Sequence, residues 1–156
     1  MRIGQGIDVH RFSDDPSRAL LIGLVEIPGA PGLAGHSDAD VATHALCDAL
    51  LGAANLGDLG RHFPDTDASI AGVSSKSLLE QTLKLVSDAG YRCASGDITI
   101  IAERPRLASF MPSMSEALSA VVGTVISVKA TTTEGLGAIG RAEGIAASAV
   151  VLIEEK

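Results

Sequence analysis

The sequence is poor in aromatic residues, with no tryptophan, one tyrosine and three phenylalanines among its 156 residues. A core must therefore be built mainly from aliphatic side chains and alanine. Hydrophobic residues make up 46% of the chain, which excludes an intrinsically disordered protein. Because no repeat, linker or low-complexity tract interrupts a chain of this length, we predict a single domain over residues 1–156.

Cysteines and long apolar runs are also scarce. The two cysteines, Cys47 and Cys93, lie far apart, which excludes both a disulfide framework and a Cys-x-x-Cys metal site. The longest apolar run, residues 145–153, has about half of the roughly 20 residues that a membrane-spanning helix needs. The first residues lead directly into patterned sequence without an apolar signal core. We therefore expect a cytoplasmic protein that does not associate with a membrane.

Positive charge is limited as well, since the chain has 12 lysines and arginines but 19 aspartates and glutamates. Its net charge is therefore −7. This balance excludes broad contact with the backbone of a nucleic acid. An anionic ligand would therefore need a local set of donors. Eight of the twelve cationic residues are arginines, whose planar group is suited to binding phosphate.

Alternation of residue types over residues 2–9 predicts a strand. One face of this strand carries Ile3, Ile7 and Val9, and the other carries Gly4, Gly6, Asp8 and His10. The short apolar run at 19–27 is expected to pair with this strand in the manner of a hairpin. Further strands are predicted at 91–101, 125–131 and 146–153.

Three helices are predicted from apolar periodicity and from residues that start or end helices. A Ser-x-x-acid pattern at Ser37 opens a helix over about 38–55, and a second helix runs from about residue 78 to Gly90. The same pattern at Ser113 opens a third helix that stops at Gly123. Residues 56–73 are rich in glycine and aspartate and predict an irregular loop.

This order of elements does not alternate regularly between strand and helix. We therefore predict an α+β fold in which helices pack on one face of a mixed β-sheet. The other face must also be covered, and the last predicted strand is almost free of polar residues. Packing of that face against other subunits is the expectation that follows.

Two residues on one face of the first predicted strand could bind a metal ion. Asp8 and His10 leave the same face behind two glycines, which allow close approach of another element. His44 shares one helical stripe with Asp40 and Asp48, either of which could orient its ring. Two histidines and one carboxylate leave one tetrahedral position open, as in catalytic zinc sites.

The same three residues have other interpretations. Asp8 could satisfy a turn, with the histidines as separate polar residues near the surface. Two histidines and one carboxylate also suit non-haem iron, so the spacing does not choose the metal.

Two further segments could contact phosphate. Residues 36–38 open a helix, where backbone N–H groups favour anions, although an ordinary helix cap explains them equally well. Residues 130–137 combine three threonines with Glu134 and could hold phosphate oxygens and a hard cation, although threonines also suit any strand. Arg141 beside Glu143 is most simply a surface ion pair.

Taken together, six segments resemble the 2-C-methyl-D-erythritol 2,4-cyclodiphosphate synthase family in order and spacing. They are RIGQGIDVH at 2–10, GHSDADV at 35–41, HA at 44–45, GDLG at 57–60, FPDTD at 63–67 and KATTTE at 129–134. Each motif is weak alone, but the match runs nearly from end to end of the chain.

The resemblance implies a homotrimeric lyase of the non-mevalonate isoprenoid pathway with active sites between neighbouring subunits. Such an enzyme converts 4-diphosphocytidyl-2-C-methyl-D-erythritol 2-phosphate into 2-C-methyl-D-erythritol 2,4-cyclodiphosphate and CMP. The 2-phosphate of the substrate attacks the β-phosphorus. Two alternatives remain at this point: a non-haem iron oxygenase that uses the same three ligands, and a non-enzymatic trimeric nucleotide-binding module.

The resemblance also implies roles for individual residues. Asp8, His10 and His44 hold a catalytic Zn2+, and Glu134 helps to hold a second ion, Mg2+ or Mn2+. His36 and Thr132 stabilise the transition state. The implied contacts with substrate phosphates and with the methylerythritol part are Ser37, Thr131, Thr133, Asp58, Leu59, Gly60, Phe63, Pro64, Asp65, Thr66 and Asp67.

The cytosine ring is expected to meet the segment Ala102, Glu103, Arg104, Pro105, Arg106, Leu107 and Ala108, largely through backbone groups. Arg141 lies where the family has an arginine near the trimer axis, and a central cavity there would take an isoprenoid diphosphate. The chain differs from the family pattern at Gly135 and Ala138, where lysine and an aromatic residue are frequent.

Overall fold

The computed structural model describes residues 1–64 and 72–156. Four strands form one mixed sheet in the order β1 (Arg2–Arg11), β6 (Gly144–Glu155), β4 (Tyr91–Ile101) and β5 (Ile126–Thr131). β6 runs antiparallel to both of its neighbours, whereas β4 and β5 are parallel. The parallel pair is connected through α4 (Met111–Val122), because parallel strands need a crossover. The predicted mixed sheet is confirmed.

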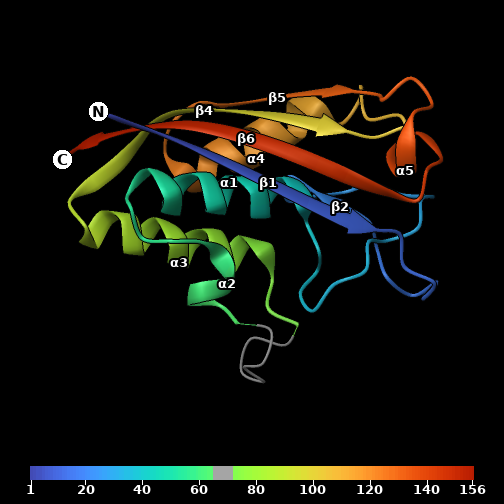
Figure 1. Cartoon of the computed structure of the whole chain (residues 1–156), viewed down its shortest axis with the longest axis horizontal. Helices are drawn as coiled ribbons and strands as arrows, with labels where there is room; N and C mark the ends of the chain where they lie inside the picture. Colours follow the sequence, from blue (N-terminus) through green and yellow to red (C-terminus); the bar gives the residue numbers. More distant parts are fainter. Residues whose placement is uncertain (65–71) are drawn as a thin grey trace.

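The helices gather on one side of this sheet, as the sequence predicts. α1 (Val41–Ala53) packs on β1 and β6, and α3 (Ser75–Asp88) packs on α1. Both helices lie below the strands in Figure 1. α4 contacts both β5 and α3 and therefore lies on the same side. Two four-residue helices complete the set, α2 (Leu59–His62) within the predicted loop and α5 (Gly137–Gly140) before β6.

Close packing of α1 on β1 depends on two glycines. A Cβ atom at Gly4 would lie 1.9 Å from the carbonyl oxygen of Ala49, and one at Gly6 would lie 2.1 Å from that of Ala45. No side chain fits at such distances, so α1 approaches β1 only because both positions are glycine. This approach sets the distance between the helix and the end of β1 that carries Asp8 and His10.

The predicted partner of the first strand is wrong. Residues 19–27 do not pair with β1 but form their own hairpin, β2 (Leu21–Ile22) and β3 (Val25–Glu26). Gly23 and Leu24 both have positive φ, at 59° and 66°, so the run folds back on itself in a tight two-residue turn. β1 instead pairs along its whole length with β6, which is long enough to match it.

Two predicted helix starts are also wrong. α1 is capped by Asp40 rather than Ser37, because the Asp40 carboxylate accepts a hydrogen bond from the Thr43 N–H. α4 begins at Met111 without a side-chain cap, and Ser115, inside the expected capping box, donates to the Ile126 carbonyl. The predicted stop of this helix is confirmed, since Gly123 adopts the left-handed conformation at φ 80°.

Among the described residues, no long helix packs on the opposite face of the sheet. The predicted faces of β1 are confirmed, with its glycines buried and its large apolar residues outside. Ile3, Ile7 and Val9 are 74%, 59% and 58% exposed, and Val150 on β6 adds a fourth apolar side chain at 46%. An apolar cluster of this kind on one face favours a protein partner. Among the described helices, none has the length and apolar character to cross a membrane.

Asp40 anchors the β2–β3 turn to α1 and is fully buried. Its carboxylate accepts from the backbone N–H groups of Gly23 and Leu24 at 2.8 and 2.7 Å, and from Thr43 at both N–H and hydroxyl. Asp40→Ala leaves these donors unpaired. We expect the free energy of unfolding in urea, at fixed protein concentration, to fall by about 3–5 kcal/mol. Asp14→Ala, at an exposed position, is the matched control and should unfold like the wild type.

Candidate active site

The end of β1 and the first turns of α1 bring together three side chains that could hold a metal ion, called the metal-binding group below. The His10 Nε2 atom lies 2.9 Å from the Asp8 carboxylate, and the His44 Nδ1 atom lies 3.1 Å from the same oxygen. The two ring nitrogens are 3.3 Å apart. Asp8 and His10 share a face of β1 because they are two residues apart, and the glycine contacts hold α1 close enough for His44 to reach them. The predicted convergence of these three residues is confirmed.

The charges of the three groups are strongly coupled. Partial burial raises the pKa of the Asp8 carboxyl, but hydrogen bonds from His10 and His44 outweigh it and hold that pKa well below its usual range. The hydrogen bond to Asp8 raises the pKa of His10 in spite of its partial burial. The three side chains are therefore arranged to place positive charge beside an ionised carboxylate, and a divalent cation meets the same requirement.

The outer nitrogens of both histidines have partners as well. The His10 Nδ1 atom lies 2.8 Å from the Ala34 carbonyl, to which it donates. The His44 Nε2 atom lies 3.2 Å from the Ser37 hydroxyl and 3.0 Å from the Ser75 hydroxyl. These contacts leave the His10 Nε2 and His44 Nδ1 atoms facing Asp8, where a metal ion could take the place of their protons.

The expectation that Asp40 or Asp48 orients His44 is wrong. Asp40 is fully used by the hairpin turn and the helix cap, and Asp48 accepts from the Leu59 N–H at 2.7 Å. Ser75 takes this position instead, and no motif in the sequence marks this residue. Ser75 lies in the first turn of a helix that follows a long loop, and this position could have drawn attention to it. The sequence does not indicate, however, which element that turn contacts.

Asp48 connects the metal-binding group to one predicted substrate segment. It lies one helical turn after His44, and its hydrogen bond to Leu59 fixes the start of α2. Burial raises the pKa of Asp48, and the nearby carboxylates of Asp58 and Asp8 add to this effect. Asp58 itself caps α2 by accepting from the Arg61 N–H. The structure thus holds Leu59, at the start of α2, beside a residue that lies one helical turn of α1 from His44.

The remaining residues of this half of the site are partly described. His36 is exposed on the segment before α1, and its carbonyl accepts from the Gly72 N–H at 3.1 Å. Phe63 and Pro64 follow α2 directly. The predicted contacts Asp65, Thr66 and Asp67 lie outside the described residues.

The second half of the predicted site lies at the far edge of the sheet. Thr131 ends β5, and Thr131, Thr132 and Glu134 are exposed. The Thr132 hydroxyl donates to the Glu134 carboxylate at 3.2 Å, and Glu134 has a positive φ of 52°, which is uncommon for a residue with a Cβ atom. Since β6 and β4 separate β5 from β1, three strand spacings of about 4.8 Å place this group roughly 14 Å from β1. One chain does not bring Glu134 to its own metal-binding group.

The predicted cytosine segment lies beside this second half. The Ala102 N–H donates to the Thr131 carbonyl at 3.0 Å, so the ends of β4 and β5 remain paired beyond the strands. Glu103, Arg104, Pro105 and Arg106 line a cavity of about 870 Å³, whereas Ala102 and Leu107 are buried and Ala108 is exposed. Arg141 pairs with Glu143 at 2.6 Å, which confirms the expected ion pair and leaves its role at a trimer axis a prediction.

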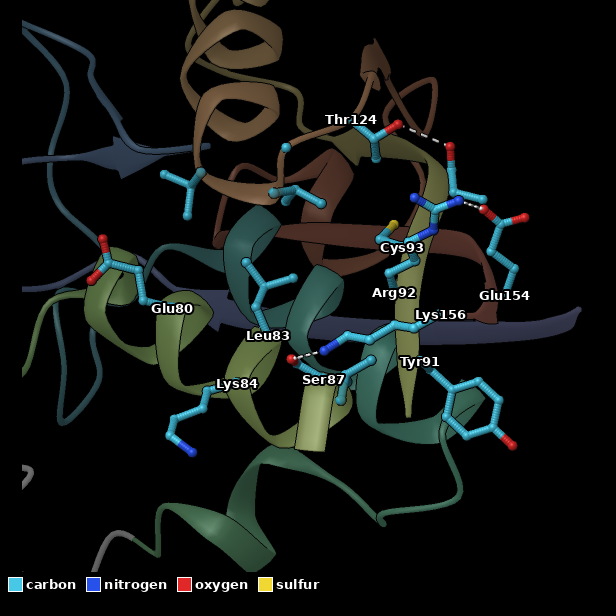
Figure 2. Close-up of a pocket in the computed structure, with 15 residues that line it drawn as sticks. Glu80, Leu83, Lys84, Ser87, Tyr91, Arg92, Cys93, Thr124, Glu154 and Lys156 are labelled. Carbon is cyan, nitrogen blue, oxygen red and sulfur yellow. Dashed lines mark hydrogen bonds and ion pairs between the residues drawn. The ribbon is translucent and has the colours of Figure 1, made fainter. Parts of the chain in front are cut away.

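A separate cavity of about 740 Å³ lies at the other end of the molecule (Figure 2). The end of α3, the start of β4 and the end of α4 line it. Arg92 pairs with Glu154 at 2.7 Å, Lys84 pairs with Asp88, and Lys156 donates to Ser87. Arg92 and Glu154 thus neutralise each other within the cavity, and none of the predicted site residues lines it.

Comparison with known proteins defines the class of this fold and site. The model of the YgbB family matches residues 1–154, and the chain belongs to this family. A protein of Nitrosococcus oceani is 52% identical over 159 residues, which cover 100% of this chain and 99% of the relative. That relative is a 2-C-methyl-D-erythritol 2,4-cyclodiphosphate synthase. The enzyme class that the sequence resemblance implies is therefore confirmed, and the oxygenase alternative finds no support.

Solved structures agree with this assignment. The bifunctional IspDF of Campylobacter jejuni has a TM-score of 0.93 and 40% identity, covers 99% of this chain, and matches it over 42% of its own length. IspF of Plasmodium falciparum, solved as a CDP complex, has a TM-score of 0.85 and 31% identity and matches over 99% of this chain and 96% of its own. The α+β fold with a mixed sheet is common to all of them.

Proposed function

We propose that the chain, acting as one catalytic domain over residues 1–156, converts 4-diphosphocytidyl-2-C-methyl-D-erythritol 2-phosphate into 2-C-methyl-D-erythritol 2,4-cyclodiphosphate and CMP. The observation that carries this proposal is the convergence of Asp8, His10 and His44 within 3.3 Å of one another in a chain of this family. The CDP complex of the Plasmodium falciparum relative supports a cytidine nucleotide as the ligand.

The three side chains fit a zinc ion. Tetrahedral zinc with bonds of about 2.0 Å separates its ligands by about 3.3 Å, and the donor atoms here are 2.9 to 3.3 Å apart. The donor set of two imidazoles and one carboxylate leaves one position open. Bound there, the ion would draw electron density from a phosphoryl group as a Lewis acid. Glu134, on a neighbouring chain, would help to hold a second ion, Mg2+ or Mn2+, which prefers oxygen ligands.

The protein's own part in the reaction is to hold the two ends of one substrate in line. A phosphate oxygen of the 2-phosphate forms a bond to the β-phosphorus while the bond to the α-phosphate oxygen breaks, and CMP leaves with that electron pair. Because the attacking phosphate is already anionic near neutral pH, no side chain has to remove a proton. Orientation by the site thus supplies much of the rate.

Individual residues serve this orientation. Ser37 and the threonines 131–133 would hold phosphate oxygens, and His36 and Thr132 would stabilise the transition state. The segments 58–60 and 63–67 would grip the methylerythritol part, and residues 102–108 would meet the cytosine ring. A compartment with reducing conditions, such as the cytoplasm, fits two cysteines that are both free.

A homotrimer explains two features that one chain leaves incomplete. The uncovered sheet face exposes Ile3, Ile7, Val9 and Val150, which gain from burial against other copies. The groups at the ends of β1 and β5 lie on opposite edges of the sheet, and a neighbouring copy can bring the β5 edge to the metal-binding group. An isoprenoid diphosphate at the trimer axis near Arg141 remains part of this proposal.

Subunit exchange tests whether the site is shared. His44→Ala and Glu134→Ala homotrimers should each be nearly inactive. Mixing them at equal amounts after mild dissociation should restore about a quarter of wild-type activity, because one interface in four then combines an intact metal-binding group with an intact Glu134. Light scattering and mass spectrometry would confirm that mixed trimers have formed. If those mixed trimers recover no activity, a site between subunits is contradicted.

A phosphorus NMR time course tests the activity itself. Wild-type protein loaded with zinc and magnesium should convert the substrate signals into those of the cyclic diphosphate and CMP. Elemental analysis of the same sample should show zinc rather than iron. Binding of CMP without conversion of the substrate supports the nucleotide-binding module instead.

A further inference from the structure

Hydrogen bonds link three side chains: His44 on α1, Ser75 at the start of α3, and Asp38 in the segment before α1. The His44 Nε2 atom lies 3.0 Å from the Ser75 hydroxyl, which donates to the Asp38 carboxylate, and that carboxylate also accepts from the Ser75 N–H at 2.8 Å. We propose that Ser75 and Asp38 are positioning residues that hold His44 in the tautomer able to bind the metal ion. This inference rests on the proposed metal site.

The Asp38 carboxylate determines which atom donates in each of these hydrogen bonds. An ionised carboxylate only accepts hydrogen bonds, so the Ser75 hydroxyl proton points to Asp38. The Ser75 oxygen must then accept from His44, which places the ring proton on Nε2. In the neutral ring, the lone pair is then on the His44 Nδ1 atom, which faces Asp8 and His10 and is available to a metal ion. If the hydroxyl turned around, the ring proton would move to Nδ1, where a metal ion binds.

Ser75 is not needed to cap α3. The cap is Ser74, whose side chain accepts from the Ser77 N–H at 3.2 Å. Ser75 is fully buried, and the hydrogen bonds of its hydroxyl among the described residues are with Asp38 and His44. The buried Ser75 hydroxyl therefore acts on the His44 ring, whose orientation and ring proton it can fix.

Ser37 does not duplicate this role. Its hydroxyl also lies 3.2 Å from His44 Nε2 and accepts from the Ala39 N–H, but no contact among the described residues fixes its proton. Ser37 is also less buried than Ser75, and the proposed function uses it to hold a phosphate. Of the described residues near His44 Nε2, the Ser75–Asp38 pair alone supplies an acceptor whose proton direction is fixed.

Two substitutions test the pair by zinc affinity, measured in competition with a chromophoric chelator. Ser75→Ala removes the acceptor of the His44 proton. Asp38→Asn keeps the shape and can still accept from the Ser75 N–H, but its amide can donate to the Ser75 oxygen and turn the hydroxyl toward His44. We expect zinc affinity to fall about 10–100-fold in both variants.

Ser74→Ala is the matched control, since it removes the helix cap one residue away and touches neither His44 nor Asp38. It should lower the stability of the protein while leaving zinc affinity unchanged. Wild-type zinc affinity in both Ser75→Ala and Asp38→Asn overturns the proposal, as does an equal loss in Ser74→Ala. If the wild-type protein binds no zinc, both the proposed metal site and this inference are wrong. If the wild type binds zinc and both variants bind it equally well, only this inference is wrong.

Discussion

Replacing His44 with alanine should lower the rate of CMP release by at least about a thousandfold and should remove zinc from the purified protein. His44 supplies one of three ligand atoms that lie 2.9 to 3.3 Å apart, and the two that remain do not complete a tetrahedral site. Asp8→Asn should give the same result, because it removes the charge that both histidines face. Turnover is followed by phosphorus NMR and metal content by elemental analysis.

The control for this experiment is His62→Ala. His62 donates to the Leu56 carbonyl and has no part in the metal-binding group, so zinc content should not change in that variant. Circular dichroism and light scattering should show that His44→Ala remains folded and associated. Normal turnover by His44→Ala after treatment with a chelator contradicts the metal-dependent mechanism.

Gly6→Ala should have the second largest effect, although Gly6 has no functional group. Its added methyl would lie 2.1 Å from the Ala45 carbonyl oxygen and 2.7 Å from the Ala49 nitrogen, so α1 must move away from β1. We expect the free energy of unfolding to fall by about 3 kcal/mol or more. Because the same movement carries His44 away from Asp8 and His10, zinc binding should fall with stability.

Gly52→Ala provides the comparison within the same helix. A methyl group there meets no atom within 4 Å, and alanine favours helix over glycine by about 1 kcal/mol. The variant should therefore be as stable as the wild type or more so, with unchanged zinc content. Zinc affinity equal to that of the wild type in Gly6→Ala indicates that the approach of α1 does not set the site.

Elements with a strong local pattern were predictable from the sequence. The strand of residues 2–9 and the arrangement of its faces follow from strict alternation, and the stop of α4 follows from a glycine. The hairpin at 19–27 and the start of α1 were not predictable, because both depend on Asp40. Its carboxylate bonds to a turn seventeen residues earlier in the chain, and local patterns do not show such contacts.

The candidate site divides in the same way. Residue types and spacing identified Asp8, His10 and His44, since strand and helix periodicities place side chains on known faces. Neither Ser75 nor the true partners of Asp40 and Asp48 could be found in this way, because a hydroxyl or a carboxylate fits many hydrogen bonds. Contacts between distant elements choose among them.

The sequence by itself determined the α+β class and the family to which the chain belongs, and it identified the three residues that could hold a metal ion. Only the tertiary structure decided that Ser75 and Asp38 complete the surroundings of His44 and that Glu134 lies across the sheet from the metal-binding group. The physical reason is that periodicity fixes the direction of a side chain within its own element. The distance between two elements depends on how closely their backbones pack, which here is set by Gly4 and Gly6.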